Sequence, residues 1–108
     1  MIIFLVYNMN LSGKNLNSLT KLSIPRIIEE YFLCGYNKLS TLEGGPEIVT
    51  GFVCYCNELI SLKGSPKKVE NMFFCANNYL TSLIYFPKKR RYMNFSYYKN
   101  HLLTLDYF

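Results

Sequence analysis

Apolar and polar positions alternate along this chain in an order that repeats about every 21 residues. One complete unit has these fixed positions: Pro46, Val49, Phe52, Cys54, Asn57, Leu59 and Leu62. The same order returns from Pro25, Pro66 and Pro87, so that consecutive prolines are 21, 20 and 21 residues apart. A single unit of this length cannot bury its apolar positions, and units with such a period stack on one another. The pattern therefore predicts a solenoid.

Within a unit, the run Gly51–Tyr55 alternates with period two and predicts a short strand. Phe52 and Cys54 are then expected to point into the core, while the residues between them point outward. The leucines of the following L-x-x-L segment add two buried side chains. Gly64 and Pro66 predict a turn, because glycine permits positive φ and proline interrupts a helix. The short return path favours extended or 3₁₀ structure with little α-helix.

We predict a single domain over residues 1–108. Its expected parts are an N-terminal cap or degenerate repeat at 1–24, repeats at 25–45, 46–65 and 66–86, and a degenerate C-terminal repeat or cap at 87–108. Within the cap, residues 2–7 are interpreted as an apolar strand. Asn17, Leu19 and Leu22 are interpreted as a compressed copy of the later N-x-L-x-x-L pattern.

The spacing P-x-x-V-x-x-F-x-C-x-x-N-x-L-x-x-L of residues 46–62 resembles the leucine-rich repeat, in its short bacterial form of about 20 residues. The resemblance covers residues 25–105 well and 1–24 loosely. It departs from the family pattern by a cysteine at an aliphatic strand position and a glycine before the proline. It implies a β-rich member of the α/β-type leucine-rich-repeat superfold. Such a solenoid is curved and carries a concave parallel β-sheet, here of about four to five short strands.

Proteins with these short repeats include secreted effectors of bacterial pathogens and phage and bacterial reading frames. Most members of the family are protein-binding modules. The effectors also carry a separate catalytic ligase domain. We expect no such domain here, because the repeats account for nearly all of the 108 residues. The resemblance also assigns a structural role to an asparagine ladder, whose side chains bond to the backbone of neighbouring turns. Its members are Asn37, Asn57, Asn78 and Asn100.

Three of the four cysteines fall at one position of the repeat: Cys34, Cys54 and Cys75. They are expected to point inward as free thiols, because parallel side chains in register are poorly aimed for a disulfide. Cys56 precedes a ladder asparagine, and its only potential imidazole partner, His101, lies two repeats away, about 9–10 Å by strand spacing. That separation excludes a nucleophile–base hydrogen bond. We expect no catalytic residue, no metal site and no cofactor, and hence no enzyme.

The alternation leaves one set of side chains on the concave face, and these are the predicted partner-binding residues: Tyr31, Leu33, Val53, Tyr55, Met72, Phe74 and Tyr98. Gly35, Gly51 and Ala76 are expected to leave gaps among them. A contiguous apolar and aromatic surface of this kind is typical of an interface. A protein partner is expected there, or a second copy of the chain in a homodimer. The alternative is a set of ordinary strand residues that the cap or a second copy partly covers.

The net charge of +5 is uneven, because the first 50 residues hold four basic and four acidic side chains. The excess forms a basic strip along one edge of the predicted sheet: Lys67, Lys68, Lys88, Lys89, Arg90 and Arg91. Three interpretations remain open for this strip: a solvated edge, a contact with an acidic protein, or a contact with RNA, DNA or a ribonucleoprotein.

The sequence predicts neither a signal peptide nor a membrane span, so we expect a cytoplasmic protein, in the host cytoplasm if a phage encodes it. The function expected is that of a non-enzymatic protein-binding module, an inhibitor or adaptor acting through its concave face. A phage protein that blocks a host defence or nuclease complex is one such instance, by analogy. Nucleic-acid or ribonucleoprotein binding through the basic C-terminal half is the alternative.

Overall fold

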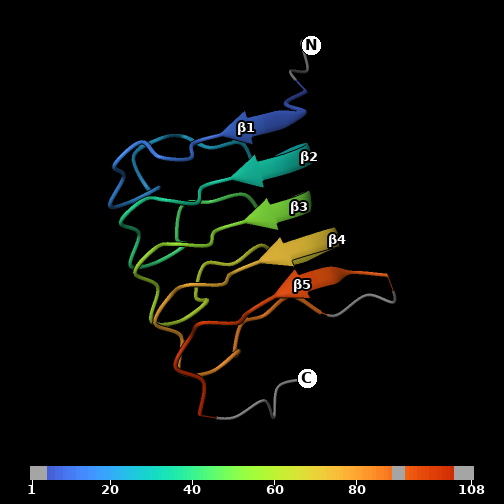
Figure 1. Ribbon diagram of the computed structural model, residues 1–108. Coiled ribbons are helices and arrows are strands. Elements are labelled where there is room, and N and C mark those ends of the chain that lie inside the picture. The colour runs from blue at the N-terminus through green and yellow to red at the C-terminus, as the bar shows by residue number, and fades with distance from the viewer. Residues whose placement is uncertain (1–4, 89–91, 104–108) are drawn as a thin grey trace.

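The protein, in a computed structural model that describes residues 5–88 and 92–103, is a parallel β-solenoid of about four turns. Its strands are β1 (Asn8–Asn10), β2 (Ile27–Leu33), β3 (Ile48–Val53), β4 (Lys68–Phe74) and β5 (Asn94–Ser96). They form one sheet in the order of the sequence, and every neighbouring pair is parallel (Figure 1). The return segments contain turns and bends, with no helix in the described ranges. The predicted solenoid and its parallel sheet, expected to have about four to five strands, are thus confirmed.

Columns of identical residues fill the core, because parallel strands in register place equivalent side chains one strand spacing apart. Phe32, Phe52 and Phe73 are fully buried, and their ring centroids lie 5.5 and 5.4 Å apart in nearly parallel planes. Cys34, Cys54 and Cys75 form a second buried column of free thiols, as the repeat predicts. The leucines of the return segments complete the core with Leu19, Leu39, Leu42, Leu59, Leu62, Leu80 and Leu83.

The ladder asparagines connect each turn to the one before it. Asn57 donates from Nδ2 to the carbonyl oxygens of Cys34 and Cys54, at 3.0 and 3.1 Å, and accepts the Leu39 N–H at 3.0 Å. Asn78 repeats this arrangement one turn later. Asn37 and Asn100 make the equivalent bonds at the two ends. The expected backbone hydrogen bonds of these side chains are therefore present.

The backbone also enters the left-handed region at two recurring places, and in the first turn additionally at Asn15. The first is the residue before the ladder position: Gly13, Tyr36, Cys56, Asn77 and Lys99, with φ between 54° and 64°. The second is two residues before each proline: Ser23, Gly44, Gly64 and Tyr85. Glycine tolerates this conformation, whereas other residues adopt it at a cost that the surrounding hydrogen bonds must offset. The chain therefore reverses direction through backbone geometry that recurs even where glycine is absent.

The predicted register of the first turn is wrong by three residues. The Lys38 N–H bonds to the Leu16 carbonyl, just as the Glu58 N–H bonds to the Leu39 carbonyl one turn later. Leu16 and Leu19 are thus the L-x-x-L pair of this turn, and Lys14 occupies the ladder position. Asn17 and Leu22 are exposed, Leu22 to 41%. Five residues separate Leu19 from Pro25, whereas three separate Leu42 from Pro46. Because of this longer link, Asn17, Leu19 and Leu22 match the N-x-L-x-x-L spacing although they are out of register with the later turns.

The predicted apolar strand at residues 2–7 is also corrected. Residues 2–4 lie outside the described residues, and the strand itself is the polar segment Asn8–Asn10. The carbonyls of Val6 and Tyr7 accept hydrogen bonds from Glu29 and Glu30 of β2. The apolar run therefore leads into the strand, and the side chains of Asn8 and Asn10 lie at the edge of the sheet.

A difference in strand length explains the unequal repeat lengths. β2 and β4 have seven residues and β3 has six, and the pairing register shifts after Ile28 and after Val49. One residue, Thr50, fills the place of two in the neighbouring strands, and its Oγ1 donates to the Glu29 carbonyl at 2.8 Å. Beyond this irregularity the strands return to register, so that Tyr31, Gly51 and Met72 form one row.

Candidate partner-binding face

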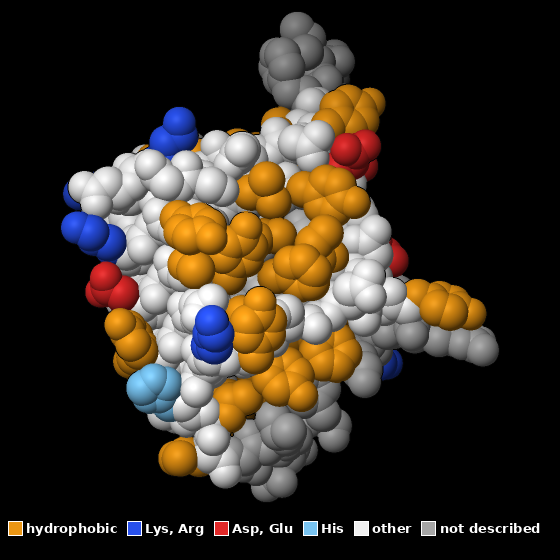
Figure 2. Space-filling view, viewed as in Figure 1, with side chains coloured by type: hydrophobic (Ala, Val, Ile, Leu, Met, Phe, Trp, Pro, Cys, Tyr) orange, Lys and Arg blue, Asp and Glu red, His pale blue; other side chains and the backbone are white. Residues whose placement is uncertain are grey.

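The face of the sheet that points away from the core, called here the outer sheet face, consists of three rows of equivalent positions. The first two rows are set by strand pairing and contain Tyr31, Gly51, Met72 and Asn94, and then Leu33, Val53, Phe74 and Ser96. The third row follows the strands and contains Gly35, Tyr55, Ala76 and Tyr98. All seven residues predicted for the concave face lie in these rows. Figure 2 shows hydrophobic side chains gathered on this side of the molecule, with most charged groups near its border.

Two of the three predicted gaps are filled. A Cβ atom at Gly51 would collide with the ring of Tyr31, so this ring lies over Gly51. A Cβ atom at Gly35 would come within 3.5 Å of the ring of Tyr55, so that ring covers Gly35. The glycines therefore let large aromatic side chains lie flat on the sheet, and the face is smoother there than the sequence suggests.

The predicted residues differ in accessibility. Tyr98 is 62% exposed, whereas Val53, in the centre of the second row, is 7% exposed. Its neighbours in the row, Leu33 and Phe74, are half-buried. Val53 thus supports the face from below and presents little surface to a partner. This is a correction to its predicted role as a contact residue.

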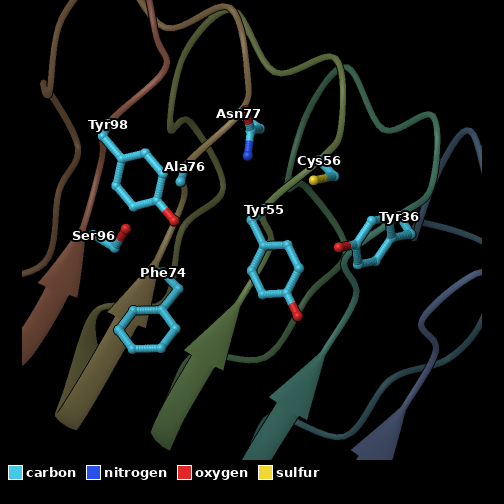
Figure 3. Close-up of a pocket in the computed structure, with 8 residues that line it drawn as sticks. All are labelled: Tyr36, Tyr55, Cys56, Phe74, Ala76, Asn77, Ser96 and Tyr98. Atoms are coloured by element: carbon cyan, nitrogen blue, oxygen red, sulfur yellow. The ribbon is translucent and has the colours of Figure 1, made fainter.

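A hollow of about 370 Å³, called here the aromatic hollow, opens at the C-terminal ends of β3, β4 and β5. Its apolar walls come from Tyr55, Phe74 and Tyr98, and Ala76, 3% exposed, forms part of its floor. Figure 3 shows the rings of Tyr98 and Phe74 on one side, with Phe74 at the strand end, and the ring of Tyr55 on the other. Tyr36 stands behind Tyr55, edge to face, with ring centroids 5.3 Å apart. The walls are therefore aromatic on three sides.

The polar lining of the aromatic hollow comes from Cys56, Asn77 and Ser96. Cys56 and Asn77 are left-handed residues, and this conformation places them at the rim, outside the core columns (Figure 3). Cys56 lies beside the Tyr36 hydroxyl and, together with Tyr55, raises the pKa of that hydroxyl. Among the described residues that line the hollow there is no Lys, Arg, His, Asp or Glu.

A second hollow, called here the cationic hollow, adjoins the first and shares Cys56 and Asn77 with it. Its other lining includes Lys99, His101 and Tyr79. The His101 ring meets Tyr79 edge to face, with centroids 5.7 Å apart. His101 is the single histidine of the chain, and Figure 2 shows it on the same side of the molecule as the hydrophobic patch. The chain thus sets one lysine, Lys99, and its single histidine directly beside the aromatic hollow.

The basic strip is described only in part, because Lys89, Arg90 and Arg91 lie outside the described residues. Lys67 follows Arg26 and Glu47 along adjacent turns, and Arg26 and Glu47 form an ion pair at 3.3 Å. Lys68 pairs with Glu70 at 3.7 Å. Lys88 is exposed. In the described part, basic and acidic side chains therefore alternate along this edge.

The three buried thiols have low reactivity. Burial raises the pKa of Cys34 and of Cys75 to about 12, and raises that of Cys54 as well. These groups stay protonated at neutral pH and are poor nucleophiles. Across residues 5–88 and 92–103, no cluster of three or more His, Cys, Asp or Glu side chains could hold a metal ion.

No protein-family model, no curated protein and no solved structure matches this chain. The described residues also include no helix long and apolar enough to cross a membrane. The site must therefore be interpreted from its own geometry.

Five residues of the two hollows were missed at the sequence level: Tyr36, Asn77, Tyr79, Ser96 and Lys99. Tyr36, Asn77 and Lys99 precede a ladder asparagine, Tyr79 follows one, and Ser96 occupies the Val53 position in β5. A signal was available for the three residues that precede an asparagine, because this position varies freely while its neighbours repeat. Strand alternation does not predict which way the side chain before each ladder asparagine points, because this residue is left-handed and lies after the strand.

Proposed function

We propose that this protein is a binding module that holds a protein partner on its outer sheet face. The observation that carries the proposal is the aromatic hollow, which is set among half-buried apolar rows on a regular sheet. Across five strands the face extends about 19 Å by strand spacing, enough for a small interface. Aromatic residues and Met are enriched at the centres of interfaces, where they contribute large contact areas.

The sheet supports such a role because its face is held from below. The stacked Phe32, Phe52 and Phe73 and the asparagine ladder fix the strands, so that the outer side chains start from a rigid platform. A partner then binds with little ordering of the backbone, which lowers the entropic cost of association. We propose that the module acts as an inhibitor or adaptor, since both roles require occupation of a surface and no bond-making chemistry.

We also propose that the chain is related to the leucine-rich-repeat proteins and that its outer sheet face is concave. It rests on the asparagine ladder and on the L-x-x-L return segments. A phage origin and a target in a host defence system rest on the resemblance of the repeats.

The test compares Phe74→Asp with Ile60→Asp as a matched control. Phe74 lines the aromatic hollow, whereas Ile60 is 66% exposed on a return segment, away from the face. Both variants are immobilised and exposed to extract of the native source, and retained proteins are identified by mass spectrometry. We expect a partner that Ile60→Asp retains and Phe74→Asp loses, with unchanged circular dichroism. Equal retention by two folded variants would reject the outer sheet face as the binding surface.

Nucleic-acid binding through the basic strip remains the second candidate. It is supported by the exposed Lys67 and Lys88 and by the sequence of residues 89–91. Neutralising Lys88 to Arg91 should then weaken binding to single-stranded RNA, and affinity should fall steeply with salt. Retention of RNA that ignores salt would rule this candidate out.

A further inference from the structure

The aromatic and cationic hollows meet along a shared rim. Cys56 and Asn77 line both, and none of the described residues that line either hollow is acidic. One half is therefore apolar and neutral, and the other half carries Lys99 and His101. A surface of this composition fits a group that is apolar at one end and negatively charged at the other.

The spacing of the two halves follows from the backbone. Tyr98 and Lys99 are consecutive, yet they line different hollows. The reason is that Lys99 takes the left-handed conformation, with φ of 55°, and so leaves the row that Tyr98 ends. An extended peptide advances about 3.3 Å per residue. A side chain anchored in the aromatic hollow thus places its next one or two residues against the cationic hollow.

We propose that the two hollows together bind a short segment of a protein partner in which an aromatic or long aliphatic anchor is followed within two residues by Asp or Glu. The anchor enters between Tyr55 and Tyr98. The carboxylate pairs with Lys99, and with His101 when that ring is protonated. This inference rests on the proposed function and specifies the chemistry of the partner.

Charge complementarity favours an acidic peptide over a nucleic acid at this place. A nucleic acid brings a phosphate with every nucleotide and needs a line of cations to follow it. Beside the first row of the face, Glu30 accepts a hydrogen bond from Asn8, so the basic surface does not continue in that direction. Arg26 and Lys68 are already paired with glutamates. One carboxylate needs only Lys99, and gains His101 when that ring is protonated.

The test uses blocked synthetic heptapeptides as probes. The first has the sequence Gly-Ser-Phe-Gly-Glu-Gly-Ser, and its variants replace Phe by Gly, or Glu by Gln or Lys. Each is titrated into the full ¹⁵N-labelled chain at low salt, and amide chemical shifts give the site and the Kd. We expect the first peptide to shift the Ala76, Asn77 and Lys99 amides. Replacing Glu by Gln should weaken binding about two- to fivefold, as for an exposed ion pair, and replacing Phe by Gly should weaken it at least about tenfold.

Variants of the protein give the matching half of the experiment. Tyr98→Ala removes one wall of the aromatic hollow and should raise the Kd about tenfold. Lys99→Gln should raise it about two- to fivefold, whereas Lys21→Gln, at an exposed lysine that lines neither hollow, should leave it unchanged. Equal affinity for the Glu and Lys peptides would overturn the proposal. The proposal would also be overturned if a uridine hexanucleotide shifted the Ala76, Asn77 and Lys99 amides at concentrations at which the peptides do not.

The outcome can be separated from that of the proposed function. Suppose that Phe74→Asp loses the captured partner while Tyr98→Ala and Lys99→Gln both keep it at full affinity. The outer sheet face then binds the partner, but the inference that the partner supplies an anchor followed by Asp or Glu fails. If Phe74→Asp keeps the partner, the proposed function itself fails.

Discussion

The Nδ2 atom of Asn57 lies 3.0 Å from the carbonyl oxygen of Cys34, a residue 23 positions earlier and one turn back. The same side chain accepts the Leu39 N–H through Oδ1. A single asparagine thus connects two turns: it accepts the buried Leu39 N–H and is a second donor to the Cys34 and Cys54 carbonyls, which also accept from Asn37 and Asn78. Because each turn repeats the arrangement, the ladder is the polar counterpart of the stacked phenylalanines.

Replacing Asn57 by Ala should lower the free energy of unfolding by about 3 kcal/mol, because it leaves the buried Leu39 N–H without its partner and removes two further hydrogen bonds to backbone carbonyls. Chemical denaturation with urea measures the loss. Asn17→Ala is the matched control and should change stability by less than about 0.5 kcal/mol, since Asn17 is exposed. Comparable losses in the two variants would restore Asn17 to the ladder and contradict the corrected register of the first turn.

Two left-handed glycines differ in the space around them and give a second prediction. Gly13 has φ of 64° and open space where a Cβ would lie, whereas at Gly64, with φ of 88°, a Cβ would collide with the backbone of Leu42 and Glu43. Gly13→Ala should cost about 1 kcal/mol, the strain of the left-handed conformation alone. Gly64→Ala should cost at least about 3 kcal/mol, because two adjacent turns must separate. Thermal and urea unfolding of both variants tests this difference, and equal losses would contradict the close approach of the turns.

The buried thiols predict a loss of stability at high pH. Folding raises the pKa of Cys75 from an ordinary 9.0 to about 12, so the folded state keeps the proton more tightly than the unfolded state does. Between these two values the unfolded chain releases the proton first. Stability must therefore fall as pH rises from 9 toward 12, by up to about 1.4 kcal/mol per pH unit for one thiol. Cys75→Ala should show a shallower decline than the parent chain in urea unfolding at pH 8.0, 9.5 and 10.5, and parallel slopes would refute this account.

The same burial predicts how the cysteines react. At pH 8 a thiol reagent should modify Cys56 in the folded protein well before the others, because Cys56 is partly exposed and the remaining three are buried. All four should react after denaturation. Rapid modification of more than one thiol in the folded state would show that the cysteine column opens.

Two serines of one return segment should respond to alanine in opposite directions. Ser65 Oγ is buried without a hydrogen-bond partner among the described residues, so Ser65→Ala should raise the free energy of unfolding by about 1 kcal/mol. Ser61 Oγ accepts the Lys63 N–H at 3.3 Å, so Ser61→Ala should lower it by about 0.5 kcal/mol. Denaturant midpoints measure both changes. A loss of stability in Ser65→Ala would mean that this hydroxyl has a partner.

The regular middle of the chain could be predicted because each position there has one physical role. Phe52 and Cys54 alternate with outward residues, and strand geometry alone sends them to opposite faces. The first turn could not be predicted in the same way. Asn17 and Leu22 match the repeat in sequence, but the longer link before Pro25 moves them out of register, and only the hydrogen bond from Lys38 to Leu16 reveals the shift.

The candidate site shows the same division. Alternation correctly assigned Tyr55, Phe74 and Tyr98 to the outer sheet face, but it could not tell which would be accessible. Val53 is covered because its neighbours in adjacent strands are large. The gaps at Gly35 and Gly51 close because aromatic rings from neighbouring turns lean across them. These are relations between turns, about 20 residues apart in the chain.

The sequence by itself determined that this protein is a stack of parallel turns, which residues of each turn form the core and which face outward. Periodicity is a local property, and one unit contains all the information it needs. The tertiary structure alone decided which outward residues form a usable surface. Row neighbours come from different turns, and left-handed residues such as Asn77 and Lys99 leave the strand alternation altogether. The pairing of an aromatic with a cationic hollow therefore exists only once the turns are stacked.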